Sequence, residues 1–203
     1  MDYAAAIGFM AIVATLLTGG LVAKKRGSST RREAAKAAIL LVVAVAAVAL
    51  LYRFVLGVYI VPSVSMLPTL QVNDRVVVNK FVYRFVSPAE GDIIVFVAPP
   101  NAKDKGVAGT EYFIKRVIGL PGDIIECKNG SVYRNGQALT ENYVTGQTSG
   151  DHAAIQVPPA HVFVMGDNRD NSFDSRDWGC LDMSMIVGRA NMIIWPRSRL
   201  GYI

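Results

Sequence analysis

Residues 62–70 read Pro-Ser-Val-Ser-Met-Leu-Pro-Thr-Leu and stand where a strongly apolar N-terminal region gives way to one rich in β-strand signals. Pro62 and Pro68 disfavour helix and hold this stretch extended. In an extended chain, side chains two residues apart point to the same side, so we expect Ser63 and Ser65 to share one face of a cleft. For an isolated Ser-x-Ser pair, the alternative is a turn with solvated hydroxyls.

Two apolar runs precede this stretch, and their lengths fit helices that span a membrane. Tyr3 to Ala23 is 21 residues without a charge, and at ~1.5 Å per residue it crosses a hydrocarbon core of ~30 Å. The second run begins at Ala37 and continues to residue 60, with Arg53 as its one charged residue. The competing interpretations are a cleaved signal peptide for the first run and a buried core helix for the second.

The excess of basic residues is concentrated in the short segment between these runs. Residues 24–36 carry six Lys or Arg and one Glu, whereas the chain from residue 37 onward has 15 basic and 14 acidic residues. A short positive loop between two apolar runs is typical of the cytoplasmic side of a membrane. We therefore expect a first transmembrane helix over residues 1–23, a basic cytoplasmic loop over 24–36, a second transmembrane helix over 37–60 and an extracytoplasmic domain over 61–203. A near-neutral domain lacks the basic face that nucleic-acid binding requires.

The region after residue 61 alternates short β-branched and aromatic runs with turn signals, and it shows no long helical periodicity. Asn129-Gly130 predicts a tight hairpin, while residues 99–110 and 145–160 are expected to be loops. These patterns predict a mainly β domain of antiparallel sheets. The expected strands are Arg75–Asn79, Ile93–Val97, Phe113–Ile118, Ile124–Cys127, Ser131–Arg134, Val162–Met165 and Met192–Trp195.

Lys115 stands in one of these strands, fifty residues after Ser65. It shares a strand face with Phe113 and Val117, so we expect it to be buried. Burial disfavours the ammonium form and lowers the pKa, and a neutral amine can take a proton from a serine hydroxyl. Lowering a lysine pKa from ~10.4 to ~7 disfavours its charged form by roughly 4–5 kcal/mol. The alternative is an ordinary lysine on a solvated strand edge.

A dense polar run follows the strand Val162–Met165, over residues 166–179. Such a run is either a surface loop or a buried hydrogen-bond network with Asp–Arg pairs, because carboxylate and guanidinium match bidentately. The two cysteines, Cys127 and Cys180, have no metal-site spacing, so we expect no metal or cofactor. They are consistent either with one disulfide or with two buried thiols.

In combination, these segments resemble the bacterial type I signal peptidases, or leader peptidases, which are serine proteases with a Ser/Lys dyad. The resemblance covers residues 59–187. It rests on the order of three motifs: Pro-Ser-x-Ser-Met-x-Pro-Thr-Leu, a Lys-Arg strand ending in Gly-Leu-Pro-Gly-Asp, and Gly-Asp-Asn-Arg-Asp-Asn-Ser-x-Asp-Ser-Arg. The two preceding apolar runs match the Gram-negative layout of that family, and the short stretch between Lys115 and Gly166 implies a small accessory insertion.

The resemblance implies a role for each matching residue. Ser65 is the nucleophile, Lys115 the general base, and Ser63 the oxyanion-hole hydroxyl that works with the Ser65 backbone N–H. Ser172 hydrogen-bonds and orients the lysine, Met66 belongs to an apolar surface that meets the bilayer, and both histidines are uninvolved. The acid–base pair that supports the site is Asp174 with Arg176. Shallow apolar pockets for small substrate side chains, which favour Ala-x-Ala, are implied at Tyr59, Val61, Pro62, Phe113 and Ile114.

The activity implied is removal of signal peptides from exported pre-proteins at the bacterial cytoplasmic membrane. The catalytic domain is then on the periplasmic or extracellular side, and the expected partners are signal peptides, membrane lipid and the nearby protein-export translocon. Two alternatives stay open. One is a related protease with a narrow task, such as maturing a conjugation pilin or cleaving itself, and the other is a catalytically silent β-domain that binds a secretion partner.

Overall fold

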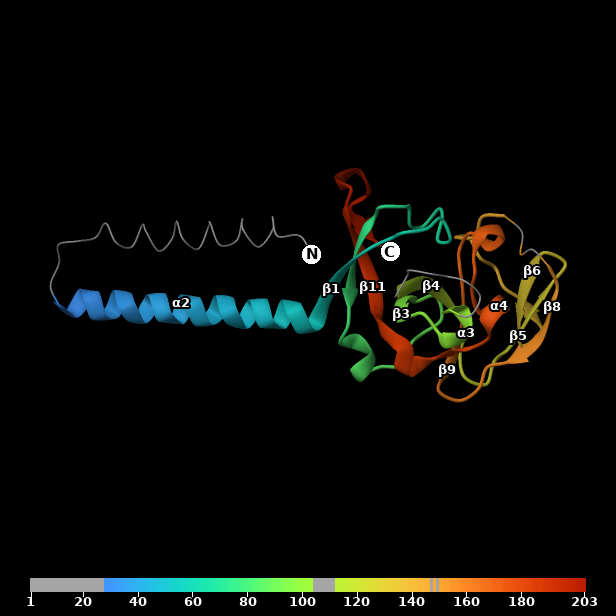
Figure 1. The fold of residues 1–203 in the computed structure, drawn as a ribbon, viewed down its shortest axis with the longest axis horizontal. Helices are drawn as coiled ribbons and strands as arrows, with labels where there is room; N and C mark the ends of the chain where they lie inside the picture. Colours follow the sequence, from blue (N-terminus) through green and yellow to red (C-terminus); the bar gives the residue numbers. More distant parts are fainter. Residues whose placement is uncertain (1–27, 104–111, 147, 149) are drawn as a thin grey trace. The chain divides into compact units, whose positions relative to one another are not determined.

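A computed structural model of the protein describes residues 28–103, 112–146, 148 and 150–203. The chain divides into two compact units, Met1–Tyr52 and Arg53–Ile203. Helix α2 extends over Ser28–Val55 (Figure 1). The predicted first helix, and the part of the basic loop up to residue 27, lie outside the described residues. Within the part of the chain that the structure describes, no helix is long and apolar enough to cross a membrane.

Two predicted boundaries around α2 are wrong. The helix already includes the segment from Ser28 to Lys36, expected to be a loop, because its Arg, Glu, Lys and Ala residues are good helix formers. It ends at Val55 rather than at residue 60, and Leu56–Ile60 forms strand β1 instead. The β-branched and aromatic side chains of β1 favour a strand, and β1 pairs with the neighbouring strand β2, Arg75–Asn79.

The second unit is built on one large sheet, as the predicted antiparallel β domain requires. Among the described residues its strand order is β1-β2-β11-β3-β4-β9-β10, with β12 paired to β11. All of these pairings are antiparallel. The remaining strands of this sheet are β3 (Ile93–Val97), β4 (Tyr112–Gly119), β9 (His161–Met165), β10 (Leu181–Asp182), β11 (Ile186–Trp195) and β12 (Gly201–Tyr202).

Strand β3 shows how the large sheet is covered on both faces. Ile93 and Val95 belong to one hydrophobic cluster, whereas Ile94 and Phe96 belong to a second, because successive side chains of a strand point to opposite faces. The first cluster includes Met66, which is fully buried. The expectation that Met66 lies on a surface meeting the bilayer is therefore wrong, and this residue instead anchors the stretch 62–70 in the core.

A smaller sheet lies at the end of the unit away from β1 and β11 (Figure 1). Its hairpin turns at Asn129 and Gly130, whose φ angles of 51° and 74° confirm the predicted tight turn. Strand β8 falls in a region expected to be a loop, where two alanines weaken the strand pattern. The strand order is β7-β6-β5-β8, with β5 Ile124–Lys128, β6 Ser131–Arg134, β7 Gln137–Ala138 and β8 His152–Gln156.

Short helical turns connect the strands. Asp174 begins helix α4, Ser175–Trp178, in a capping box with Asp177. Asn79 accepts hydrogen bonds from the backbone N–H groups of Phe81 and Val82 and so begins the turn η1, Val82–Arg84. The other turns are α3 (Pro100–Lys103), η2 (Arg169–Asn171), η3 (Met183–Met185) and η4 (Arg197–Arg199).

The two cysteines are free thiols in this structure. Cys127 is buried in the cluster that joins the small sheet to the large one, and Cys180 packs against the same cluster. Burial raises the pKa of both thiols, so they behave as apolar packing groups. The structure therefore matches the second of the two alternatives for this pair, two thiols rather than a disulfide.

Candidate active site

Asn168 holds the backbone of Ser65 in place by binding the carbonyl groups before and after its Cα atom. The backbone N–H of Asn168 donates to the Ser65 carbonyl at 3.0 Å, and the Asn168 side-chain amide donates to the Val64 carbonyl at 3.1 Å. The turn continues through a hydrogen bond from Leu70 N to Met66 O at 2.8 Å. Both of these apolar side chains are fully buried, so the serine stands on an anchored segment and is itself 5% exposed.

Lys115 reaches Ser65 from strand β4, and the two side chains are in direct contact. Lys115 Nζ lies 2.5 Å from Ser65 Oγ, and the lysine is 5% exposed. Its predicted burial is confirmed. Burial lowers the pKa of Lys115 to about 8, although the nearby Asp174 carboxylate opposes this effect. A lysine with such a pKa is partly neutral near physiological pH, which is what a general base requires.

Ser63 completes a small polar cluster at one end of an apolar hollow. Its Oγ lies 3.1 Å from Ser65 Oγ, so the expected placement of both hydroxyls on one side is confirmed. The extended conformation predicted for this stretch is wrong, because residues 65–69 form turns. The hollow has a volume of about 300 Å³. It is lined by Pro62, Ser63, Ser65, Tyr112, Phe113, Ile114, Lys115, Asn171 and Phe173.

The residues predicted to bind substrate lie together beside this hollow. A second, smaller depression of about 20 Å³ adjoins it and shares the walls Pro62, Phe113 and Ile114. Tyr59 also lines the depression, where its ring meets that of Tyr112 edge to face at 5.4 Å. The fifth predicted residue, Val61, lines it from the core, at 1% exposure. These walls leave room for small apolar side chains.

The predicted support residues form a buried network next to Lys115. Asp174 is fully buried and accepts hydrogen bonds from Arg176 Nε at 2.8 Å and from Ser172 Oγ at 2.6 Å. Burial would raise the pKa of Asp174, but the Arg176 guanidinium and the Ser172 hydroxyl outweigh it and lower the pKa. The carboxylate is therefore charged. Between the described residues Ser172 and Lys115 there is no hydrogen bond, so the expectation that Ser172 hydrogen-bonds the lysine directly is wrong. Ser172 donates to Asp174 instead, and the charge of that carboxylate raises the pKa of Lys115.

Gly166 lies between the serine segment and this network, where the two are close together. A Cβ at this position would lie 2.3 Å from Ser172 Oγ and 2.4 Å from the Ser65 carbonyl oxygen. Any side chain here would push one of the two serines away. Gly166 was visible in the sequence as the first residue of the polar run, but its role depends on a contact that the pattern does not show.

A second ion pair, absent from the sequence prediction, ties three segments of the site together. Arg116 donates to both carboxylate oxygens of Asp167, at 2.8 and 2.7 Å, and Thr69 Oγ1 donates to the same carboxylate at 2.5 Å. Arg116 follows Lys115, Thr69 belongs to the serine segment and Asp167 belongs to the polar run. The position of Arg116 beside the lysine was the signal that sequence reasoning left unused.

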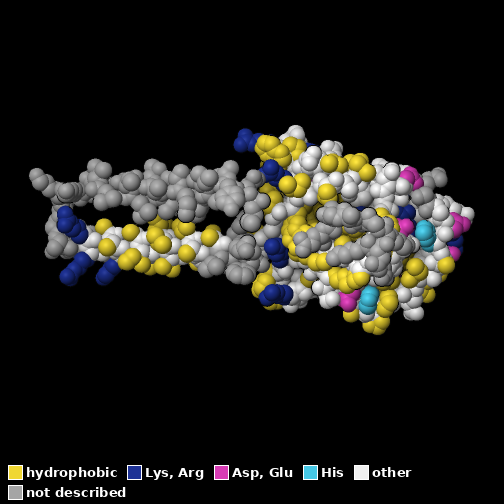
Figure 2. Space-filling view, viewed as in Figure 1, with side chains coloured by type: hydrophobic (Ala, Val, Ile, Leu, Met, Phe, Trp, Pro, Cys, Tyr) yellow, Lys and Arg dark blue, Asp and Glu magenta, His cyan; other side chains and the backbone are white. Residues whose placement is uncertain are grey.

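The two histidines lie outside this constellation, as expected. Neither lines the hollow at Ser65, and the half-buried ring of His161 has Nδ1 2.9 Å from the Pro159 carbonyl. Figure 2 shows histidine and acidic side chains on the part of the unit away from β1, β2 and β11. Among the described residues, no cluster of His, Cys, Asp or Glu has the arrangement of a metal site.

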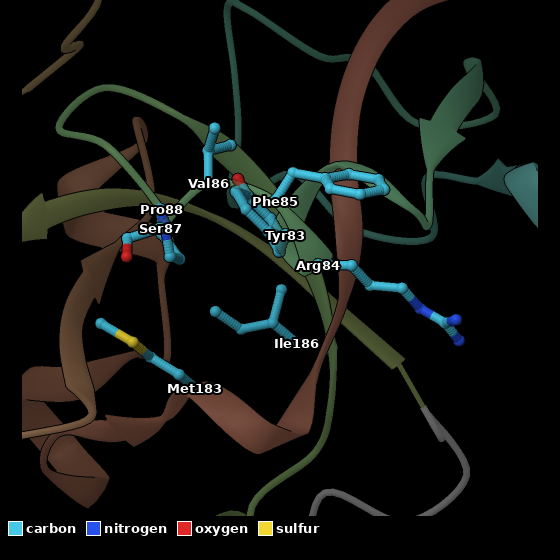
Figure 3. Close-up of a pocket in the computed structure, with 8 residues that line it drawn as sticks. All are labelled: Tyr83, Arg84, Phe85, Val86, Ser87, Pro88, Met183 and Ile186. Carbon is cyan, nitrogen blue, oxygen red and sulfur yellow. The ribbon is translucent and has the colours of Figure 1, made fainter.

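Another hollow, of about 300 Å³, lies between the turn Tyr83–Pro88 and the side chains of Met183 and Ile186 (Figure 3). It shares no lining residue with the hollow at Ser65. The Tyr83 hydroxyl donates to Asp92 at 2.9 Å. No lysine or histidine stands among the described residues that line this hollow, so it offers no second pairing of a nucleophile with a base.

Comparison with known proteins gives this geometry its context. The family model described as "Signal peptidase, peptidase S26" matches residues 32–195, which is more than half of the chain. The chain belongs to the signal peptidase family. Membership makes it a serine endopeptidase of the signal peptidase I type, and the resemblance inferred from the three motifs is confirmed.

Individual signal peptidases are similar over most of the chain. Signal peptidase I of Leptolyngbya laminosa is 46% identical over 148 residues, which cover 73% of this chain and 73% of that protein. Probable signal peptidase I-1 of Synechocystis sp. is 48% identical over 156 residues, covering 76% and 80%. A solved signal peptidase I from Enterococcus faecalis V583 is 30% identical, with a TM-score of 0.42 over 51% of this chain and 97% of that one.

Proposed function

We propose that this protein is a membrane-bound signal peptidase that removes N-terminal signal peptides from exported pre-proteins through Ser65 and Lys115. The observation that carries the proposal is the 2.5 Å contact between Lys115 Nζ and Ser65 Oγ, with both side chains almost fully buried. The relatives named signal peptidase I support the substrate class. A nucleophile in contact with a desolvated base is the arrangement that covalent hydrolysis requires.

The first half of the reaction forms an acyl-enzyme. Neutral Lys115 takes the Ser65 proton as Ser65 Oγ attacks the carbonyl carbon of the scissile bond. The resulting oxyanion accepts hydrogen bonds from the Ser63 hydroxyl and the Ser65 backbone N–H. The Lys115 ammonium then protonates the leaving amine, the C–N bond breaks, and the signal peptide remains bound to Ser65 as an ester.

The second half restores the enzyme with water as the nucleophile. Neutral Lys115 takes a proton from a water molecule whose oxygen attacks the ester carbonyl, and a second oxyanion forms in the same hydrogen-bonding site. Its collapse breaks the bond to Ser65 Oγ, which recovers its proton from the Lys115 ammonium. Ser65 and Lys115 thereby return to their starting protonation states, and no metal ion or cofactor takes part in these steps.

The proposed cleavage site follows an Ala-x-Ala-like sequence. The walls formed by Phe113, Ile114 and Tyr112 are apolar and close together, and the adjoining depression is only about 20 Å³. Alanine side chains fit such spaces, whereas a longer side chain would require the walls to move. An apolar wall also offers no partner for a charged substrate side chain, whose burial without one is costly.

Membrane attachment forms the remaining part of the proposal. The uncharged run Tyr3–Ala23 and the second apolar run support two spans, with the basic segment 24–36 on the cytoplasmic side. In α2, the apolar side chains from Ile39 to Val43 are 51–69% exposed, which favours an apolar environment. A membrane-held enzyme meets a membrane-held signal peptide at a raised effective concentration. This placement also brings the enzyme near the translocon that delivers its substrates.

Cleavage of a purified pre-protein tests the chemistry. Wild type, Ser65→Ala and Lys115→Ala should first be matched for thermal unfolding in the same detergent. We expect wild type to cut after Ala-x-Ala, both variants to be folded and inactive, and a pre-protein with Leu in place of the last Ala to resist cleavage. Cleavage by Ser65→Ala at the wild-type rate would place the nucleophile elsewhere.

Extraction and protease protection test the membrane part. We expect the full chain to stay in the membrane fraction after washing with alkaline carbonate. In right-side-out vesicles, added protease should reach residues 61–203 but not 24–36. Release of the chain by carbonate would rule out the proposed spans and leave the cleavage chemistry untouched.

A further inference from the structure

Residues 141–146, here called the strap, connect the small sheet to the site without lining the hollow at Ser65. The strap has no regular secondary structure beyond a single bridge between Thr145 and Asn168. Its contacts end on each of the three segments that build the site. These contacts distinguish it from an ordinary surface loop, whose polar groups would face solvent.

The first contact is a buried ion pair with the polar run. Glu141 accepts hydrogen bonds from two guanidinium nitrogens of Arg169, at 2.9 and 2.5 Å. The side chains are 9% and 1% exposed, respectively. Arg169 Nε also donates to the carbonyl of Gly166 at 3.0 Å. The pair therefore holds the backbone at the glycine that separates Ser65 from Ser172.

The second contact is an aromatic ring stacked on the arginine beside the general base. The guanidinium carbon of Arg116 lies 4.0 Å from the ring centroid of Tyr143, within the range of a cation–π interaction. The Tyr143 hydroxyl donates to Glu141 at 2.8 Å. Tyr143 thus joins the Glu141–Arg169 ion pair to the Arg116–Asp167 ion pair.

The third contact reaches the serine segment itself. Thr145 Oγ1 donates to the Leu67 carbonyl at 3.2 Å, and the Thr145 backbone N–H donates to the Asp167 carbonyl at 3.2 Å. Asn168, the next residue, donates to the Ser65 carbonyl. Thr145 is therefore connected to the Ser65 backbone in two ways. One is through Leu67, two residues after the serine, and the other is through the segment Asp167–Asn168.

We propose that the strap is a positioning element of the active site, with Tyr143 and Thr145 as its principal positioning residues. The contacts end on the segments that hold Ser65, Lys115 and the polar run, and no described residue of the strap lines the hollow at Ser65. A displacement of about 1 Å between catalytic groups can cost about 10²-fold in rate. The strap then affects the chemical step and not substrate affinity. This inference rests on the proposed Ser65–Lys115 reaction.

The test compares steady-state kinetics of Tyr143→Leu, Tyr143→Phe and a control, Tyr133→Leu, on a purified pre-protein. Tyr133 is a suitable control because its ring lies 4.6 Å from a lysine, Lys128, in the small sheet. We expect Tyr143→Leu to lower kcat by about tenfold or more, with KM within about twofold of wild type. Tyr143→Phe keeps the ring over Arg116 and should retain most of kcat, and Tyr133→Leu should retain all of it.

A second variant keeps the test decisive if Tyr143→Leu does not fold. Thr145 is exposed, so Thr145→Val removes the hydroxyl contact to Leu67 at little risk to folding, and it too should lower kcat at constant KM. Wild-type kcat in either folded variant, a change in KM alone, or an equal loss in Tyr133→Leu would overturn the proposal. Cleavage by Ser65→Ala would instead overturn the proposed reaction, and the strap proposal with it.

Discussion

Lys115 Nζ lies 2.5 Å from Ser65 Oγ, although fifty residues separate the two in the chain. The serine stands on a turn whose apolar side chains are anchored in the core, and the lysine stands on a strand with neighbours on both sides. Both backbones are therefore fixed before substrate arrives. Burying the lysine costs free energy because it disfavours the charged ammonium. The same effect lowers the pKa of Lys115, and the reaction requires a lysine with a lowered pKa.

The pH dependence of kcat/KM should show this lowered pKa directly. Burial lowers the pKa of Lys115 to about 8, so at pH 7 only about one tenth of the free enzyme carries the neutral amine. We expect kcat/KM to rise about tenfold between pH 7 and pH 9, with an acid limb of slope one. A profile that stays flat from pH 6 to pH 9 would show that Lys115 is not the titrating base.

The free energy of unfolding should also depend on pH because of this shifted pKa, and it should increase as pH rises. The unfolded lysine has a pKa of 10.5 and the folded one about 8, so between these values the unfolded state binds more protons. Stability from this group therefore rises as pH increases from about 8 to about 10.5, by roughly 3 kcal/mol.

Urea unfolding of wild type and Lys115→Met at several pH values measures this contribution, because the other titrating groups cancel in the difference. Methionine fills the same apolar site without a charge. We expect the variant to be more stable than wild type at pH 7, with the gap narrowing at pH 10. A gap that does not change with pH contradicts the assignment.

Substituting the buried carboxylate should affect both stability and the base. Asp174→Asn leaves the Arg176 guanidinium, 4% exposed, without its charged partner, which typically costs about 3–5 kcal/mol. The Asp174 charge also raises the pKa of Lys115, so its removal should move the acid limb of kcat/KM to lower pH.

A matched exposed pair serves as the control for Asp174→Asn. Glu126 pairs with Lys128 at 2.8 Å, but the two side chains are 33% and 42% exposed, so Glu126→Gln should leave stability nearly unchanged. An Asp174→Asn variant as stable as Glu126→Gln would mean that the buried pair is unimportant. An acid limb that moves to higher pH would contradict the electrostatic part of the argument.

Local patterns in the sequence predicted much of the β domain, and the misses have physical causes. Arg75–Asn79 and Ile93–Val97 are strands at the predicted residues, because their side chains fit a pleated, buried surface. Strand β11 begins at Ile186, earlier than predicted, since Gly188 and Asn191 dilute its apolar pattern. The helix α2 ends before the apolar run does, because pairing of β1 with β2 overrides the continuous hydrophobicity.

The sequence likewise predicted one part of the site but not the rest. Ser65, Lys115 and the support residues Ser172, Asp174 and Arg176 could be named from motifs, but the ion pairs that join the segments of the site could not. Arg116 meets Asp167 across 51 residues, and Arg169 meets Glu141 across 28. Nothing in the local sequence of Glu141 or Tyr143 indicates such a partner. Long-range ion pairs depend on the finished topology, so they become visible only in the structure.

Gly166 offers the sharpest single-residue test of the packing between the two serines. A Cβ there would stand 2.3 Å from Ser172 Oγ and 2.4 Å from the Ser65 carbonyl oxygen, both far inside van der Waals contact. We expect Gly166→Ala to lower stability, because the methyl group meets a backbone oxygen as well as a side chain. In the folded fraction it should lower kcat by about 10²-fold as Ser65 moves relative to Lys115.

Gly201→Ala is the matched control, since an added Cβ at that position meets no atom within 4 Å. Its kcat should equal that of wild type. Kinetics of both variants at equal folded fraction, measured by thermal unfolding, separate the effect of the contact from that of adding a methyl group. If the folded fraction of Gly166→Ala cleaves pre-protein as fast as Gly201→Ala does, then the close packing at Gly166 does not control the position of Ser65.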